Sequence, residues 1–181
     1  MIILLGHALK TFMEKEKLNR IAVIGLPGSG KSTFATKLGK TLNIPVHHLD
    51  KHMFDDRIKR DKQEFLSIKE AFVNEQFWII EGCSLSTLEM RFARADIIIY
   101  FHLPRWLCIW RVFKRLFTFD KKIADTGCLN GINWPLIKYI WNFDRDKRES
   151  IEELRKRYPN VDFLIFRHSQ DPDKYLEKLT R

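Results

Sequence analysis

The sequence has no run of apolar residues long enough to cross a bilayer, and it has only three cysteines among 181 residues. Cys83, Cys108 and Cys128 lie far apart and lack the spacing of a zinc site, so we expect free thiols in a reducing cytoplasm. The first residues, MIILLGHAL, are apolar but short, and they lack the basic start of a secretory signal. We expect no membrane segment.

Repeats and low-complexity linkers are also missing, so one domain is expected at this length. Acidic residues are outnumbered, with 23 of them against 32 lysines and arginines, which gives a net charge of +9. This balance favours polyanionic ligands such as nucleotides, nucleic acid or an acidic surface. An apolar share of 45% with 13% aromatic residues is typical of a globular chain rather than a disordered one.

Residues 25–33 read GLPGSGKST and fit the pattern G-x-x-x-x-G-K-[S/T]. The apolar, β-branched run at 21–24 predicts a buried strand before this loop. Apolar residues four apart after it predict a helix over 32–42. Because strand, glycine loop and helix follow in this order, the pattern predicts a nucleoside-triphosphate site.

Each residue type in this loop suits a phosphate ligand. Glycines let successive backbone N–H groups face a phosphate, and the helix adds its positive N-terminal end. Lys31 is expected to reach the β- and γ-phosphates, while the Ser32 hydroxyl is expected to bind Mg²⁺. The residues predicted to bind ATP here are Gly25, Pro27, Gly28, Ser29, Gly30, Lys31, Ser32 and Thr33.

Apolar runs alternate with helical periodicity along the rest of the chain. Strands are predicted at 21–24, 45–49, 77–80, 96–103 and 163–166, and helices at 32–42, 62–74, 86–93, 104–117, 135–158 and 171–179. This alternation predicts a three-layer α/β fold with a parallel, five-stranded sheet. We expect an exposed loop at 51–62, a helical lid at about 117–134, and an N-terminal extension at 1–19 before the domain at 20–181.

Two carboxylates follow predicted strands, at the edge of the sheet where ligands bind. Glu81 is expected to hold Mg²⁺ with Ser32, directly or through water, and to face the acceptor. Asp50 is expected to contact the acceptor or deprotonate its hydroxyl. The alternative is that each merely caps a strand end or pairs with a lysine. Asp96 begins its strand, which predicts a structural role on the far side.

Several arginines are candidates for the charge of the moving phosphoryl group. Arg111 and Arg115 lie four apart on one helix face just before the lid, and Arg111 also belongs to the predicted ATP site. Arg145 and Arg148, after the lid, would complete the clamp. Arg91 would bind a phosphate or carboxylate of the acceptor. The alternative for all of them is a solvated basic surface.

Histidines and tryptophans gather in two other places. His47, His48 and His52 crowd around Asp50, but the chain must turn there and no distant cluster adds ligands, so structural zinc is not favoured. Four tryptophans flank the lid, and most are predicted to pack the two long helices, with base stacking as the alternative for one. These are Trp106, Trp110, Trp134 and Trp141.

Taken together, these residues resemble the adenylate kinase-like P-loop proteins often labelled DNA topology modulation proteins. The resemblance covers about residues 20–180 and rests on GLPGSGKST, HHLD, FWIIEGCSLSTLEMRFARAD, LPRWLCIWRVFKR and GCLNGINWPLIKYIWNFDRDKR. It implies a nucleotide-kinase-like P-loop fold with ATP at the loop and with Arg111 and Arg115 near the lid. The family usually has aspartate and Gly-Asn where this chain has Glu81-Gly82-Cys83.

We therefore expect ATP- and Mg²⁺-dependent phosphoryl transfer to a nucleotide, nucleoside or small metabolite by a monomer or dimer. The first alternative is an ATP-binding regulator associated with DNA, which the basic balance motivates. Nucleic acid is not favoured, because no helix-turn-helix or aromatic RNA motif is evident. The second alternative is a weak NTPase that acts with a protein partner.

Overall fold

Five parallel strands form the middle layer of the fold, in the order β2-β5-β1-β6-β7. The computed structural model describes residues 18–180, apart from 53, 56–57, 85–86 and 118–133. The predicted parallel, five-stranded sheet is confirmed. The strands are β1 (Arg20–Gly25), β2 (Val46–His48), β5 (Trp78–Glu81), β6 (Ile97–Phe101) and β7 (Asp162–Phe166).

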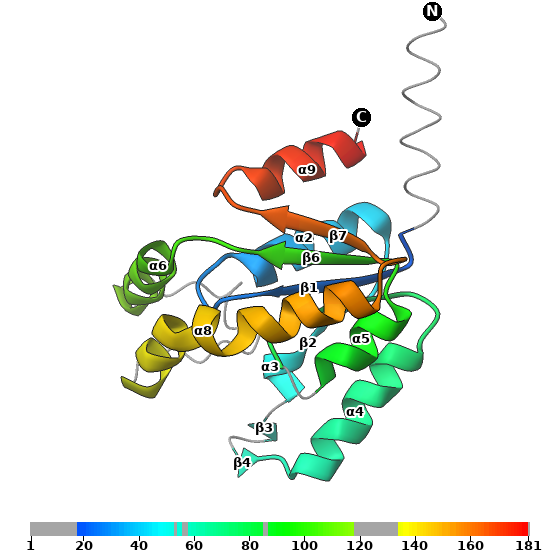
Figure 1. Cartoon of the computed structure of the whole chain (residues 1–181), viewed down its shortest axis with the longest axis horizontal. Coiled ribbons are helices and arrows are strands. Elements are labelled where there is room, and N and C mark those ends of the chain that lie inside the picture. Colours follow the sequence, from blue (N-terminus) through cyan, green and yellow to red (C-terminus); the bar gives the residue numbers. More distant parts are fainter. Residues whose placement is uncertain (1–17, 53, 56–57, 85–86, 118–133, 181) are drawn as a thin grey trace, which may run out of the picture.

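Helices cover both faces of this sheet, as Figure 1 shows, with α2 and α9 on one face and α5 and α8 on the other. The fold therefore has the three layers that the alternating pattern predicts. The helices are α2 (Lys31–Leu42), α3 (Leu49–His52), α4 (Lys62–Asn74), α5 (Leu88–Arg94), α6 (Arg105–Phe117), α8 (Trp134–Arg157) and α9 (Asp171–Thr180).

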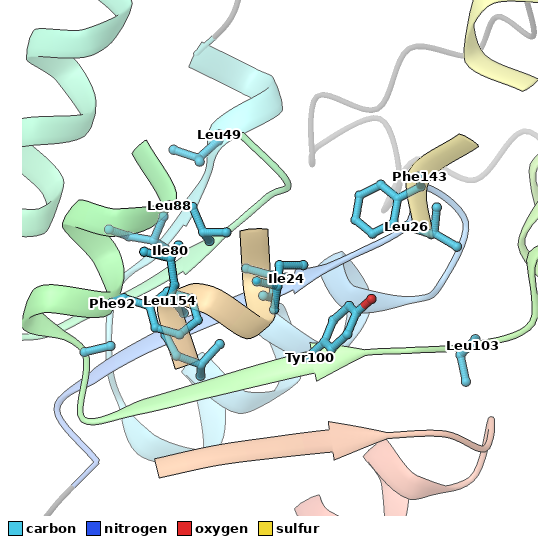
Figure 2. Close-up of a cluster of buried hydrophobic side chains, with 14 of the residues drawn as sticks. Ile24, Leu26, Leu49, Ile80, Leu88, Phe92, Tyr100, Leu103, Phe143 and Leu154 are labelled. Atoms are coloured by element: carbon cyan, nitrogen blue, oxygen red, sulfur yellow. The ribbon is translucent and has the colours of Figure 1, made fainter. Parts of the chain in front are cut away.

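The side chains of β1 explain why both faces are covered. Ile21 and Val23 pack into the core under α2 and α9, whereas Ala22 and Ile24 pack into the core under α5 and α8. All four are fully buried, as the period-two alternation of a central strand requires. Figure 2 shows the second core, where Phe92, Leu154 and Tyr100 surround Ile24.

Local signals set the ends of several helices. The Asp61 side chain accepts a hydrogen bond from the backbone N–H of Gln63 and caps α4. α2 ends where Asn43 adopts a left-handed conformation (φ 56°) and its N–H bonds the Gly39 carbonyl. Among the described residues, no helix is both long and apolar enough to span a membrane.

The structure corrects the predicted segment after the second strand. β2 ends at His48, and Leu49 turns into the core to begin α3, so Asp50 lies in a short helix and does not end a strand. The predicted exposed loop at 51–62 contains an antiparallel pair, β3 (Phe54–Asp55) and β4 (Ile58–Lys59). Strands of two residues are too short to show a periodic pattern.

The predicted packing of the tryptophans is wrong. The exposed fractions are 70% for Trp106, 54% for Trp110, 76% for Trp134 and 60% for Trp141. α6 turns Cys108, which is fully buried, toward the core in their place. α6 is amphipathic, but its most apolar side carries the exposed Trp106 and Phe113, whereas the side that packs into the core carries Cys108 and Val112.

The predicted structural role of Asp96 agrees with its contacts. Its carboxylate accepts hydrogen bonds from the backbone N–H groups of Asn19 and Arg20 and from the Arg20 guanidinium, at 2.8 to 3.0 Å. These bonds fix the start of β1 at the edge of the sheet opposite the glycine loop. Most of the predicted N-terminal extension and of the predicted lid lies outside the described residues.

Candidate active site

The glycine loop joins β1 to α2 and packs directly against the backbone of α6. Gly28 and Gly30 both have positive φ, 81° and 93°, a region that favours glycine. A Cβ atom added to Gly28 would lie 2.3 Å from the Cys108 carbonyl oxygen. The loop is therefore shaped by glycine at a close approach between two backbones.

Two features of this loop suit an anionic ligand. The Ser29 hydroxyl is buried and has no hydrogen-bond partner among the described residues. α2 begins at Lys31, and its first N–H groups face out of the helix end, where a phosphate is favoured. The Arg111 guanidinium donates to the Ser29 carbonyl at 3.2 Å, which brings this predicted residue to the loop.

A cavity of about 300 Å³ opens beside the loop. The loop side of the cavity and Arg111 are among the predicted residues, whereas the side formed by residues after β7 is not. The signal is present, because a parallel strand that ends at Phe166 brings its following residues to the same edge as the loop. The lining residues are Gly28, Ser29, Gly30, Thr33, Phe34, Lys37, Phe101, Arg111, Ser169, Pro172, Asp173 and Leu176.

Lys31 and Glu81 form a buried ion pair at the base of the loop. Lys31 Nζ lies 3.2 Å from Glu81 Oε1, and their side chains are 6% and 1% exposed. Glu81 ends β5 beside Val23 of β1, so the sheet register places it under the start of α2. Burial alone would raise the pKa of Glu81, but Lys31 and His48 outweigh burial and lower this pKa to about 2.

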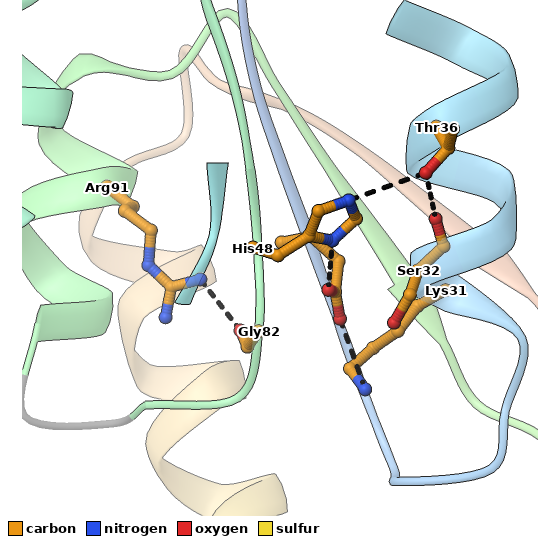
Figure 3. Close-up of polar contacts among 7 residues, drawn as sticks. Lys31, Ser32, Thr36, His48, Gly82 and Arg91 are labelled. Carbon is orange, nitrogen blue, oxygen red and sulfur yellow. Dashed lines mark hydrogen bonds and ion pairs between the residues drawn. The ribbon is translucent and has the colours of Figure 1, made fainter. Parts of the chain in front are cut away.

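His48 is the second partner of Glu81, and Figure 3 shows its ring directed toward Thr36 of α2. Its Nδ1 lies 2.9 Å from Glu81 Oε2, and its Nε2 lies 3.4 Å from Thr36 Oγ1. Thr36 in turn donates to the Ser32 carbonyl at 3.0 Å. A chain of contacts thus runs from Lys31 through Glu81 and His48 back to α2.

The contact between His48 and Glu81 is not predicted from the sequence, because it depends on the pairing of β2 with β5. In that register His48 stands beside Glu81. The available signal is that both residues come last in apolar strands, so their side chains meet if the two strands are neighbours. Among the described residues, no three histidine, cysteine or acidic side chains cluster closely enough to hold a metal ion.

Asp50 lies close enough to this ion pair for their charges to affect its acidity. Burial raises the pKa of the Asp50 carboxyl above its usual value, and the Glu81 charge raises it further. Lys31 and His48 act in the opposite direction and only partly offset burial. The structure therefore brings the two predicted carboxylates, Asp50 and Glu81, to one site.

Arg91 is fully buried, and its guanidinium donates hydrogen bonds to backbone carbonyls. It donates from Nη1 to the Gly82 carbonyl and from Nη2 to the Ser84 carbonyl, both at 2.8 Å. Burial lowers the pKa of Arg91 to about 10. Its contact with an acceptor anion stays a prediction, while its described bonds hold the segment after β5.

The remaining predicted arginines lie farther along the chain. Arg115 belongs to α6, and Arg145 and Arg148 belong to α8. The Arg148 side chain is exposed. The clamp on the moving group stays a prediction for all three, since the predicted lid between these helices lies outside the described residues.

Comparison with known proteins identifies the fold. No protein-family model matches the sequence, and no curated protein matches it. The chain is similar to a gluconokinase from Sinorhizobium meliloti 1021, at 14% identity over 90% of this chain and 89% of that chain, with a TM-score of 0.55. It is similar to a shikimate kinase from Acinetobacter baumannii, at 13% identity over 90% and 91% of the chains, with a TM-score of 0.57.

A sugar kinase from Janibacter sp. HTCC2649 matches at 11% identity over 88% of this chain and 91% of that chain, with a TM-score of 0.51. At such identities the likeness concerns the fold. The chain therefore has the α/β fold of P-loop kinases, as its sequence predicts.

Proposed function

We propose that the protein is an ATP- and Mg²⁺-dependent kinase that transfers a phosphoryl group to a small acceptor. The observation that carries this proposal is the buried pair of Lys31 and Glu81 under the glycine loop, with the Asp50 carboxylate beside it. A cation for phosphates and two carboxylates at one strand edge are what phosphoryl transfer needs. Kinases among the proteins of similar fold support the same reaction class.

On the nucleotide side, the loop N–H groups and Lys31 would hold the phosphates, and Arg111 would contact the nucleotide at the cavity. The residues present fit Mg²⁺, because Glu81 is an ionised carboxylate and the half-buried Ser32 begins the helix above it. Ser32 and Glu81 would hold the ion, which would neutralise charge on the phosphates. Arg115 and the α8 residues Arg145 and Arg148 are proposed to stabilise the moving group.

On the acceptor side, Asp50 would take the proton from the acceptor hydroxyl. A carboxylate with a raised pKa is a stronger base than an ordinary aspartate, and that suits this role at neutral pH. Arg91 is proposed to face the acceptor at the segment whose carbonyls it holds. Small metabolites, nucleosides and nucleotides are the proposed acceptor classes, and the reducing cytoplasm is the proposed location.

A coupled assay of ADP release tests this proposal. Purified protein with Mg²⁺ and ATP is assayed against nucleoside monophosphates, nucleosides and small hydroxy acids, with Lys31→Ala as the blank. Lys40→Ala is the matched control, because Lys40 is an exposed lysine of the same helix. We expect release that depends on one acceptor class, falls at least about 1000-fold in Lys31→Ala, and persists in Lys40→Ala. A folded Lys31→Ala protein with full activity would refute the kinase.

A role with DNA is the second candidate, supported by the resemblance to DNA topology modulation proteins and by the net charge of +9. It requires DNA binding that weakens with salt and persists when ATP saturates the loop. DNA binding that ATP abolishes would instead reflect anion binding at the nucleotide site. Either result leaves the acceptor assay interpretable.

A further inference from the structure

We infer that His48 is a positioning residue, which keeps the Glu81 carboxylate compensated and in place when Lys31 moves from Glu81 to the phosphates of ATP. This inference rests on the proposed function, since it assumes that Lys31 serves a nucleotide. It concerns a side chain that contacts neither the loop nor the predicted reacting groups of ATP. The proposed effect of His48 on ATP binding is exerted through Glu81.

Glu81 is almost completely buried and has few described partners. Its side chain is 1% exposed, and among the described residues its charged or hydrogen-bonding side-chain partners are Lys31 and His48. Lys31 meets one carboxylate oxygen at 3.2 Å and His48 meets the other at 2.9 Å. A buried carboxylate that loses all its partners is strongly disfavoured, so each partner matters most when the other is absent.

Two anions compete for the Lys31 ammonium, namely the Glu81 carboxylate and, under the proposed function, the phosphates of ATP. It is 5% exposed and already paired with Glu81, yet the proposed function requires its ammonium at the phosphates. Moving it therefore weakens one buried ion pair to form another contact. The cost of that exchange depends on what remains around Glu81, and the described remaining partner is the Nδ1 N–H of His48.

His48 is built to stay in place during this exchange. Its backbone is paired with that of Glu81 in the sheet, which holds the ring beside the carboxylate. Its other ring nitrogen lies 3.4 Å from Thr36 Oγ1 on α2, and the side chain is 10% exposed. Both supports come from the sheet and the helix, so they do not depend on the loop or on Lys31.

If His48 acts on ATP affinity through Glu81, its effect must depend on the charge of Glu81. Without His48 and without metal, Glu81 keeps Lys31 as its described partner, and ATP must break that pair and leave the carboxylate without a described partner. ATP affinity should then fall. If Glu81 is replaced by glutamine, no charge needs compensation, and the loss of His48 should have little effect on ATP.

A double-mutant cycle measured by calorimetry tests this coupling. ATP affinity is determined without metal, in EDTA, for the unmodified protein, His48→Ala, Glu81→Gln and the double variant. We expect His48→Ala to weaken ATP binding roughly tenfold and Glu81→Gln to strengthen it, because Lys31 is released. In the Glu81→Gln background, His48→Ala should change the affinity less than about twofold.

Two conservative variants separate positioning from folding. His48→Asn places an amide near the Nδ1 position and should restore most of the affinity, whereas His48→Gln places it toward Thr36 and should not. His47→Asn is the matched control, since the neighbouring His47 side chain contacts Glu75 and Phe72 instead of Glu81. Thermal unfolding of each variant checks that it is folded, and the Asn and Gln pair decides the matter if His48→Ala fails to fold.

The outcomes are distinguishable. If the unmodified protein binds ATP neither in EDTA nor with Mg²⁺, the proposed function and this inference both fail. If it binds ATP only with Mg²⁺, this inference alone fails. If it binds ATP and His48→Ala weakens binding equally in the unmodified and the Glu81→Gln backgrounds, His48 acts only through the fold and this inference alone fails. Equal affinities of His48→Asn and His48→Gln would overturn it in the same way.

Discussion

The two sides of the site are built by different means. On the proposed nucleotide side, the loop after β1 meets α6 backbone to backbone, and the Gly28 position leaves no room for one more carbon atom. On the other side, which is proposed to face the acceptor, β2, β5 and α5 enclose polar and charged side chains that are almost completely buried. These are His48, Arg91 and Glu81, of which Glu81 is also the proposed Mg²⁺ ligand. The proposed nucleotide side therefore has no room for an added atom at Gly28, and the proposed acceptor side is sensitive to the loss of a buried polar group.

This difference explains what each side can change. A phosphate cradle made of backbone N–H groups depends on the path of the chain, so it needs the same glycines whatever the acceptor is. Side chains such as Arg91 and Glu81 depend on their partners, and a new set of partners can suit a new acceptor. We infer that acceptor choice resides in the second side.

The largest effect is expected from Arg91→Met on the acceptor side. This change removes the guanidinium that donates hydrogen bonds to the Gly82 and Ser84 carbonyls. The buried Gly82 carbonyl and the partly buried Ser84 carbonyl then lose this donor. We expect a loss of about 3 kcal/mol in the free energy of unfolding. For a chain of this size that corresponds to a fall in melting temperature of roughly 6 to 12 °C.

Arg94→Met on the same helix is the control for this change. Arg94 bonds the Asn74 side chain at the surface. It should cost less than about 1 kcal/mol, measured by urea or thermal unfolding. Equal losses in the two variants would contradict the view that this side depends on buried polar groups.

The next effect is expected from Gly28→Ala on the nucleotide side. The new methyl group would lie 2.3 Å from the Cys108 carbonyl, so the loop or α6 must shift. We expect ATP affinity to fall roughly 10- to 100-fold. Calorimetry with ATP measures this effect.

Gly30→Ala separates crowding from backbone strain. Gly30 also has positive φ, but the nearest atom to an added Cβ is Arg111 Nη1 at 3.8 Å. Only strain should act there, and we expect a loss of roughly fivefold in affinity. If Gly30→Ala weakens ATP binding as much as Gly28→Ala does, close contact with α6 is not what shapes the loop.

The smallest effect is expected from Asp171→Asn beside the cavity, where the Asp171 carboxylate accepts hydrogen bonds from backbone N–H groups. Asp171 accepts bonds from the N–H groups of Arg167 and His168, both at 2.8 Å, and these bonds hold its pKa below the usual value. A carboxyl group whose pKa is lowered in the folded state contributes stability at pH values above the ordinary aspartate pKa. This contribution is lost as the pH falls from the ordinary pKa through the lowered one. We expect Asp171→Asn to cost less than about 1 kcal/mol at pH 7.

The pH dependence checks this assignment. The difference in unfolding free energy between Asp171→Asn and the unmodified protein should shrink as pH is lowered from 7 toward 3. A difference that stays constant over this range would mean that the charge of Asp171 does not stabilise the turn before α9.

The fold of the glycine loop could be predicted from the sequence because its signals are local. The loop, the strand before it and the helix after it follow from neighbouring residues, and Glu81 and Asp50 follow from their places after apolar runs. The contact between His48 and Glu81 requires the register of β2 against β5, which no local pattern contains. The partners of Arg91 are backbone carbonyls, which carry no sequence signature at all.

Two other differences have similar causes. The cavity wall formed by Ser169 and Pro172 depends on where β7 sits in the sheet, which is set by its pairing with β6. Trp106 and Trp110 are exposed because the most apolar side of α6 is not the side that tertiary packing buries, which carries Cys108 and Val112.

The central position of β1 also affects how the chain can fold as it is made. This strand leaves the ribosome before the other strands of the sheet, but Ile21 is flanked by Ile79 on one side and Ile97 on the other. The middle of the sheet thus forms only after more than half of the 181 residues have been synthesised. Until then this apolar strand of the nascent chain lacks at least one of its two neighbours, so folding is expected to be slow and late, with β1 accessible to chaperones and proteases.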